Sequence, residues 1–166
     1  MGTDTQMQVT RTIEAPAGRV FAVLGDPREH AAIDGSGLLQ GSDSDRVTAV
    51  GQVFTMRMYR DDLGPWRTFN TVTTFEDGRR IGWAPELDPD SELGPKLAHL
   101  TTGGHTYVYE LEERDGVTEV TQTYDWSTLR DPQFAAFCPF VSADDLRATL
   151  DRLAAAVEGA RPVTPA

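Results

Sequence analysis

His105 and Asn70 carry the side chains best suited to chemistry in this sequence. A histidine has an unperturbed pKa of about 6.5, so His105 in a pocket could act as a general acid or base at neutral pH. The Asn70 amide could donate a hydrogen bond to a developing enolate oxygen. Each residue also has a structural alternative: His105 bonded to a loop or to Trp126 at a strand start, and Asn70 pinning a neighbouring strand. The residue types leave both alternatives open.

His105 opens an alternating stretch, GHTYVYELEE (residues 104–113), that forms one arm of a predicted hairpin. Asp115-Gly116 separates it from a second alternating run, a pattern typical of a two-residue type I′ turn. This turn sets the register and places four residue pairs on one face: Leu111 with Val120, Tyr109 with Gln122, Tyr107 with Tyr124, and His105 with Trp126. The other face is rich in Thr, Asp and Glu, which indicates that it is exposed to solvent.

Two further strands are predicted to contribute to the same face. In residues 52–60 the apolar positions of one parity are Phe54, Met56 and Met58. Counting outward from the Asp77-Gly78 turn predicts two cross-strand pairs, Val72 with Trp83 and Thr74 with Ile81. Asn70 is then expected near these pairs on the same face. Phe69 and Phe75 have the opposite parity, which indicates a β-bulge.

The predicted inward face is apolar at one end and amphipathic at the other. A buried hydroxyl or ring nitrogen without a partner costs roughly 1–3 kcal/mol, whereas a wet cavity of about 300–1,000 Å³ would satisfy such groups until a ligand binds. We therefore expect a ligand cavity, with ten binding residues in addition to His105 and Asn70: Phe54, Met56, Met58, Val72, Trp83, Tyr107, Tyr109, Gln122, Tyr124 and Trp126.

The elements that position this face follow from start, stop and periodicity signals. We predict strands over residues 6–14, 38–41, 52–60, 67–76, 79–85, 105–114 and 117–126, and two short helices over 16–24 and 28–33. The stretch 86–104 has loop composition, and a connection of this length is typical of a lid or binding loop.

A long C-terminal helix completes the prediction. Ser142 is its expected N-cap and Gly159 its stop, and Leu146, Leu150, Leu153, Ala154 and Val157 form one apolar stripe. Arg147 and Asp151 have the spacing of an ion pair on the exposed side. Such a stripe needs a sheet to cover, so the whole chain, 1–166, is predicted to form one α+β domain, with 1–5 and 160–166 flexible.

This order of elements resembles the helix-grip fold of the START and Bet v 1-like (SRPBCC) superfamily, in which a curved antiparallel sheet of about seven strands wraps around a long C-terminal helix. Five stretches are similar to its polyketide cyclase/dehydrase and lipid-transport branch: IEAPAGRVFAVLGDP, DGSG, FNTVTTFEDGRRIGW, GHTYVYELEERDGVTEVTQTYDW and LRATLDRLAAAVE. The resemblance covers nearly all of the chain and implies the fold more specifically than the chemistry.

Composition excludes several classes of partner. The net charge is −11, with 26 acidic against 15 basic residues, so we expect no nucleic-acid partner. No apolar run approaches the about 20 residues of a membrane span and no signal peptide is evident, so we expect no stable membrane insertion and a cytoplasmic location. Monomer and homodimer both remain open. We expect no metal ion and no cofactor, since the histidines lack metal-ligand spacing and Cys138 is a lone cysteine.

The expected function is binding of a hydrophobic, polyketide-like or lipid-like molecule in the internal cavity. If the protein is an enzyme, the resemblance implies aldol-type cyclisation or dehydration, with His105 handling the proton and Asn70 the oxyanion. A non-catalytic carrier or sensor is an alternative, and so is a partner-binding regulatory domain.

Overall fold

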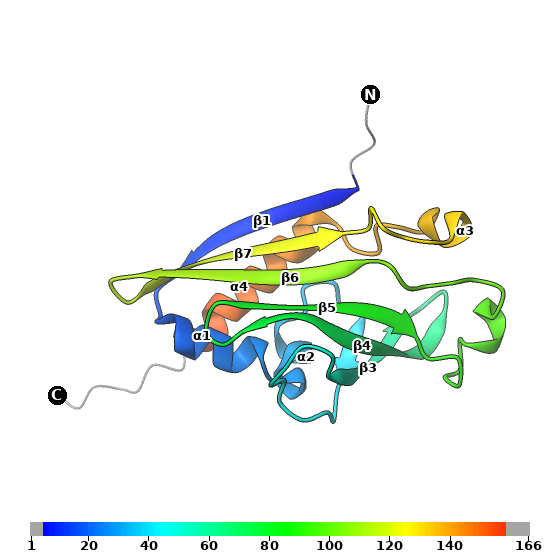
Figure 1. Ribbon diagram of the computed structural model, residues 1–166, viewed down its shortest axis with the longest axis horizontal. Coiled ribbons are helices and arrows are strands. Elements are labelled where there is room, and N and C mark those ends of the chain that lie inside the picture. The colour runs from blue at the N-terminus through cyan, green and yellow to red at the C-terminus, as the bar shows by residue number, and fades with distance from the viewer. Residues whose placement is uncertain (1–4, 159–166) are drawn as a thin grey trace.

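The described chain, residues 5–158 of the computed structural model, forms a seven-stranded antiparallel sheet with its helices on one side (Figure 1). The strands are β1 (Gln6–Ile13), β2 (Leu39–Gly41), β3 (Val53–Arg60), β4 (Gly64–Glu76), β5 (Arg80–Leu87), β6 (Thr106–Arg114) and β7 (Val117–Asp125). The helices are α1 (Ala17–Leu24), α2 (His30–Ile33), α3 (Pro132–Ala135) and α4 (Ala143–Glu158), with 3₁₀ turns η1 (Pro27–Glu29) and η2 (Pro95–Leu97). The predicted stop at Gly159 and flexible ends lie outside the described residues, except Thr5, whose carbonyl oxygen accepts a hydrogen bond from the Trp126 N–H.

The strand order is β1-β7-β6-β5-β4-β3-β2. The chain leaves β1 at one edge, crosses through α1 and α2, and starts β2 at the other edge; the remaining strands follow in order until β7 lies beside β1. This is the predicted helix-grip fold. The predicted boundaries differ mainly at β4, which begins at Gly64 rather than at residue 67, and at β5, which continues to Leu87. No helix within residues 5–158 is both long and apolar enough to cross a bilayer.

The hairpin of β6 and β7 has the predicted register. Asp115 and Gly116 have φ angles of 54° and 80°, and positive φ at both turn residues is what a type I′ turn requires. Tyr107 therefore lies opposite Tyr124, and the strand pairing ends one residue before the predicted partners His105 and Trp126. The turn residues thus fix which side chains share the concave face.

The hairpin of β4 and β5 differs from the prediction by one residue. Val72 faces Trp83 as predicted, but Thr74 pairs with Gly82 rather than with Ile81, so the predicted Thr74–Ile81 pair is wrong. The cause is the β-bulge between Val72 and Thr74, which the parity of the phenylalanines had indicated. Because the bulge adds one residue, Val72 and Phe75 both point inward although three positions separate them.

Helix α4 packs its apolar stripe against the concave face of the sheet. Ser142 caps it as predicted: the Asp145 N–H donates to Ser142 Oγ at 3.0 Å, and the Ser142 N–H donates to Asp145 Oδ2 at 2.9 Å. The expected Arg147–Asp151 pair is wrong. Arg147 pairs with Asp144 instead, and Asp151 pairs with Arg11 of β1, because that strand runs alongside the helix.

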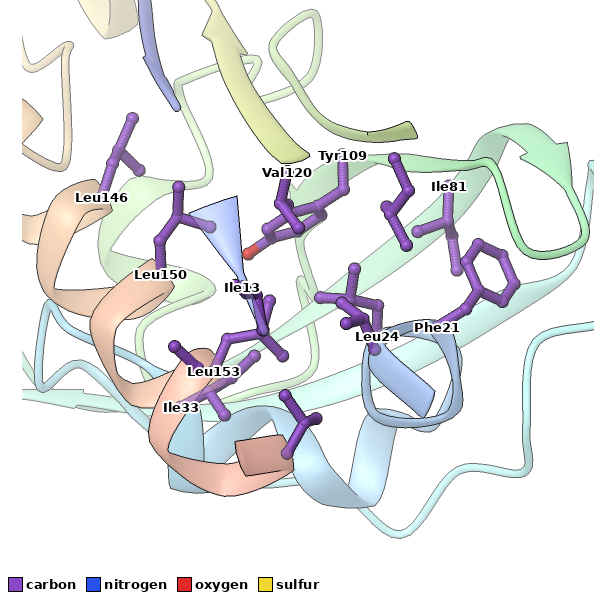
Figure 2. Close-up of a cluster of buried hydrophobic side chains, with 14 of the residues drawn as sticks. Ile13, Phe21, Leu24, Ile33, Ile81, Tyr109, Val120, Leu146, Leu150 and Leu153 are labelled. Carbon is purple, nitrogen blue, oxygen red and sulfur yellow. The ribbon is translucent and has the colours of Figure 1, made fainter. Parts of the chain in front are cut away.

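The hydrophobic core lies at the α1 end of the sheet. Figure 2 shows Leu146, Leu150 and Leu153 of α4 directed toward a cluster that includes side chains of the sheet and of α1. Ile13, Leu24 and Leu153 are fully buried there. Complete burial of such side chains is worth about 1.5–3 kcal/mol each, so this cluster makes a large contribution to stability.

Gly35 brings the segment after α2 against α4. Its N–H donates to Thr149 Oγ1 at 2.8 Å, and a Cβ at this position would lie 2.6 Å from the Thr149 nitrogen and still closer to the Asp145 carbonyl oxygen. Asp34 closes the same turn by accepting from the Ser36 and Leu39 N–H groups. The Asp-Gly-Ser-Gly stretch is thus a docking turn in which Gly35 is needed for close approach to α4, whereas Gly37 supplies a positive φ of 77°.

We expect Gly35→Ala to lower the free energy of unfolding by about 2 kcal/mol, because the methyl group meets helix backbone that cannot move aside. Gly18→Ala is the matched control: nothing lies within 4 Å of the added Cβ in α1, and alanine favours a helix by up to about 1 kcal/mol. Urea unfolding of both variants measures the difference. Equal stability of the two would show that the turn does not depend on this contact.

Candidate functional site

A cavity of about 170 Å³ lies among the sheet, α2, α4 and the loop after β5. Strands β3 to β7 all contribute to its wall, which is mostly apolar. Its volume is below the range of about 300–1,000 Å³ that we expected. The bulky rings of Trp83, Tyr107 and Tyr109, together with Leu93 and Leu97 of the loop, occupy part of the space that the strand faces enclose.

The structure places eight of the twelve predicted site residues on the cavity wall: Met56, Met58, Asn70, Trp83, His105, Tyr107, Tyr109 and Gln122. The other four lie behind it. Phe54 and Val72 belong to the hydrophobic core, with at most 1% of their surface exposed. Tyr124 stacks on Tyr107 with ring centroids 4.4 Å apart, and the Trp126 ring lies against Tyr124 with a centroid distance of 5.2 Å.

One end of the cavity is an aromatic enclosure around His105. The rings of Tyr107, Tyr124, Phe134 and Phe140 lie with centroids 5.6–6.4 Å from the imidazole. His105 Nδ1 shares a 2.7 Å hydrogen bond with the Tyr124 hydroxyl, which is neither of the two partners that we expected from the sequence. Burial lowers the pKa of His105 to about 4, so its ring is uncharged at neutral pH.

The Tyr124 hydroxyl connects His105 to Cys138. It lies 3.9 Å from Cys138 Sγ, and burial raises the pKa of both Tyr124 and the Cys138 thiol. Cys138 is half-buried. The tyrosine hydroxyl and the thiol are therefore both protonated at neutral pH, and this group of side chains carries no charge.

The opposite end of the cavity is built around Trp83. The His30 ring stacks on Trp83 at 5.1 Å, while Phe54 and Tyr109 contact the indole edge to face or at a tilt. His30 Nε2 lies 2.7 Å from the Leu24 carbonyl oxygen. Burial lowers the pKa of His30, although its bond to the Leu24 carbonyl opposes that shift, so this ring is also neutral.

Asn70 lies in β4, fully buried, beside this Trp83 end. Its amide nitrogen donates to the Phe54 carbonyl oxygen and to Thr68 Oγ1, both at 3.1 Å, and so pins β3 to β4. Its carbonyl oxygen, Oδ1, has no hydrogen-bond partner among the described residues. The group that faces no protein partner is therefore an acceptor, whereas an oxyanion stabiliser needs a donor.

The loop between β5 and β6 is anchored over the cavity by a buried carboxylate. Asp88 Oδ2 accepts from Arg67 Nε at 2.7 Å, and Asp88 Oδ1 accepts from the Asp90 N–H at 2.9 Å. Burial alone would raise the pKa of Asp88, but the Asp90 N–H and the Arg67 guanidinium lower it overall. From this anchor the loop directs Leu93 and Leu97 into the wall.

Several wall residues were not identified from the sequence. They are Ile33, Leu93, Leu97, Phe134, Phe140, Val141 and Leu146. His30 also lies on the wall and was not among the predicted site residues. It falls in the predicted helix 28–33, and no local pattern indicated its contact with Trp83, about 50 residues away. Within residues 5–158 no three His, Cys, Asp or Glu side chains lie close enough to hold a metal ion.

The curved sheet and the long helix that it grips, with a cavity between them, define a helix-grip protein of the START and Bet v 1-like (SRPBCC) superfamily. The chain belongs to the polyketide cyclase/dehydrase and lipid transport family, whose model matches residues 4–158.

Curated relatives and solved structures are consistent with this assignment. The chain is 31% identical over 125 residues, 72% of its length, to the uncharacterized protein Rv0088 of Mycobacterium tuberculosis, and it spans about half the length of the curated relatives it matches (47%). A solution structure from Arthrobacter aurescens is similar with a TM-score of 0.68 and 18% identity, covering 96% of this chain and 88% of that one. Ginseng major latex-like protein 151 from Panax ginseng has a TM-score of 0.59 and 12% identity, covering 92% and 96%. At these identities the similarity is one of fold.

The lowered pKa of His105 predicts how stability depends on pH. Between about pH 4 and 6.5 the unfolded chain binds a proton at this residue and the folded chain does not, so the free energy of unfolding falls as the pH falls. From pH 7 to pH 5 we expect His105→Gln to lose about 2 kcal/mol less stability than the original protein. His99→Gln, at an exposed loop position, is the control and should lose as much as the original. Urea unfolding at the two pH values checks this, and identical losses in all three proteins would contradict it.

Because Asp88 anchors the loop between β5 and β6, we expect Asp88→Asn to loosen this loop. The amide can still accept from the Asp90 N–H but no longer pairs with the Arg67 charge, and a pair that is half exposed on one side contributes about 1 kcal/mol. Hydrogen exchange at the Gly94 and Leu97 amides should become about fivefold faster. Asp90→Asn, at an exposed neighbouring position, should leave these rates unchanged. Equal rates in the two variants would show that other contacts hold the loop.

Proposed function

We propose that the protein binds and sequesters a small hydrophobic molecule in the cavity between the sheet and α4. The observation that carries this proposal is the composition of the wall: apolar and aromatic side chains surround a few buried polar atoms that have no hydrogen-bond partner in residues 5–158. Binding sites for small molecules typically combine an apolar surface with a few fixed polar groups. A protein evolved only for stability would fill such a space with aliphatic side chains.

Membership of the polyketide cyclase/dehydrase and lipid transport family supports the same proposal, because the family description couples this fold to hydrophobic molecules. The loop also supports it. Leu93 and Leu97 cover the cavity from the middle of a segment whose hydrogen bonds to other elements, among the described residues, lie near its ends: Asp88 bonds Arg67, and the Thr101 N–H donates to Asp131 Oδ2. A segment anchored near its ends can open and close in its middle without unfolding the core.

Cyclisation or dehydration of a polyketide-like substrate is a second candidate function. His105 favours it, because Nδ1 is held by the Tyr124 hydroxyl while Nε2 makes no hydrogen bond to the described residues. Two features weigh against it. A pKa of about 4 makes the imidazole a weak base at neutral pH, and the Asn70 amide donors are already engaged by Phe54 and Thr68. Binding without turnover is therefore the function that the geometry supports best.

A substitution that fills the cavity tests binding. Met58 of β3 lines the cavity, whereas the next residue, Tyr59, is 42% exposed on the opposite face of the same strand. We expect Met58→Trp to weaken binding of an uncharged fluorescent apolar probe, N-phenyl-1-naphthylamine, at least tenfold. Tyr59→Trp introduces the same side chain outside the cavity and should leave the affinity unchanged.

The readout is a fluorescence titration, supported by mass spectrometry of molecules extracted from the purified protein. Equal affinity in Met58→Trp, Tyr59→Trp and the original protein would place binding outside the cavity. Turnover is tested separately: if a bound substrate is converted, His105→Gln should abolish conversion while keeping affinity, and unchanged conversion would remove His105 from any mechanism.

A further inference from the structure

The Trp83 end of the cavity contains three polar groups with unused hydrogen-bonding capacity. Among the described residues, His30 Nδ1, Asn70 Oδ1 and Gln122 Oε1 are buried side-chain atoms that have no hydrogen-bond partner, and all three residues lie on the cavity wall. At most 4% of each residue's surface is exposed. Burying a polar atom without a partner is unfavourable, so three of them in one place are more than packing alone requires.

The chemistry of His30 and Asn70 is fixed by their protein partners. His30 is neutral and its Nε2–H donates to the Leu24 carbonyl oxygen, so Nδ1 presents only a lone pair. The Asn70 amide nitrogen donates to the Phe54 carbonyl oxygen, which can only accept, so the free atom must be the carbonyl oxygen. Both residues therefore offer acceptors.

Gln122 and Tyr109 form a hydrogen-bonded pair, and the number of donors and acceptors that this pair leaves free is also fixed. Gln122 Nε2 lies 2.9 Å from the Tyr109 hydroxyl. If the amide donates, Gln122 Oε1, the second amide N–H and the hydroxyl proton are free; if the hydroxyl donates to the amide oxygen, both amide N–H groups and a hydroxyl lone pair are free. In either orientation the pair offers two further donors and one further acceptor. With the acceptors of His30 and Asn70 the site offers three acceptors and two donors, and therefore still an excess of acceptors.

These groups converge on one aromatic cluster. The His30 ring stacks on Trp83, and the ring centroid of Tyr109 lies 5.8 Å from that of Trp83. Asn70 bonds the backbone carbonyl of Phe54, the residue whose own ring centroid lies 5.3 Å from the same indole. A ligand ring lying in this part of the cavity would thus have acceptors close to its edge.

The charges near the cavity disfavour an anion. Among residues 5–158, the wall contains the carboxylates of Asp34, Glu86 and Asp145 and no lysine or arginine. Burial, and after it the negative charge of Asp34, raises the pKa of Tyr107 and Tyr109, which shows that this charge is felt inside. A carboxylate ligand would meet repulsion and no counter-charge.

The size of the cavity limits the part of a ligand that it can enclose. An apolar cavity of about 150 Å³ is large enough for benzene, so about 170 Å³ accommodates one six-membered ring with small substituents.

We propose that the Trp83 end is a subsite for an uncharged ring that carries a hydroxyl donor, such as a phenol, and that His30, Asn70 and the Gln122–Tyr109 pair receive this donor. The subsite rests on the proposed binding function and names its ligand class. It excludes fatty acids and other carboxylates as preferred ligands, since these lack a donor at neutral pH and carry the same charge as the wall.

Four probes of nearly equal size test the subsite: 4-propylphenol, 4-propylanisole, 4-propylbenzoate and propylbenzene, titrated by calorimetry at pH 7. The phenol is neutral at this pH because its pKa is about 10. We expect it to bind about tenfold more tightly than the anisole, in which a methyl group replaces the donor proton, and at least tenfold more tightly than the benzoate. Competition against N-phenyl-1-naphthylamine confirms that each probe occupies the same cavity.

Two substitutions locate the preference. Gln122→Met keeps the side-chain length without polar groups and should reduce the ratio of phenol to anisole affinity about threefold or more. Gln8→Met makes the same change at an exposed position of β1 and should keep the original ratio. His30→Phe should also reduce the ratio; since it removes the bond to Leu24, its folding is checked by circular dichroism, and Gln122→Met stands as the independent test.

The outcomes separate the two proposals. If the phenol is preferred and Gln122→Met reduces that preference, the subsite is supported. If all four probes bind equally, or the anisole or benzoate binds more tightly than the phenol, the subsite is overturned while cavity binding stands. If none of the four binds and N-phenyl-1-naphthylamine also fails to bind, the proposed function itself is overturned.

Discussion

A single helix cannot cover the whole concave face of a seven-stranded sheet, and the rest of this structure depends on that mismatch. Helix α4 has 16 residues and is therefore about 24 Å long. Its apolar stripe fills the α1 end of the concave face, where Leu150, Leu153 and Val157 are fully buried. The other end is closed by α2, by Phe134 and Phe140, and by the loop after β5. Stability and cavity are thus divided between the two ends of one sheet.

The two ends of the cavity differ in what their polar atoms do. Around His105 the imidazole Nδ1, the Tyr124 hydroxyl and the Cys138 thiol form a connected neutral chain, which leaves only the imidazole Nε2 without a hydrogen bond to the described residues. Around Trp83, His30 and Asn70 each use one polar atom to bond a backbone carbonyl, while their other polar atom has no hydrogen-bond partner among residues 5–158. The second arrangement therefore retains more hydrogen-bonding capacity for a molecule that the chain does not supply.

The sequence predicted those features that local chemistry determines. The Asp115-Gly116 turn set the register of β6 and β7, and the alternation that follows from it placed Tyr107, Tyr109 and Gln122 on one face. The bulge in β4 was indicated by the parity of Phe69 and Phe75, but its position could not be read from them, and the Thr74 pairing was therefore off by one. Contacts between distant segments were not predictable in this way. His30 meets Trp83 only because α2 crosses from β1 to the far edge of the sheet, and the partner of His105 depends on how the Tyr124 ring stacks.

The β-bulge of β4 also affects how this kind of protein can evolve. A bulge bends its strand and strengthens the local twist, and this one lies between Phe75, which packs in the core, and Asn70, which lies on the cavity wall. The bend deepens the concave face at the point where the core ends. A homologous chain without the extra residue would have a flatter strand and a shallower chamber around the same side chains. Insertion or deletion of one residue here therefore provides a route to ligands of a different size without replacement of any residue that touches them.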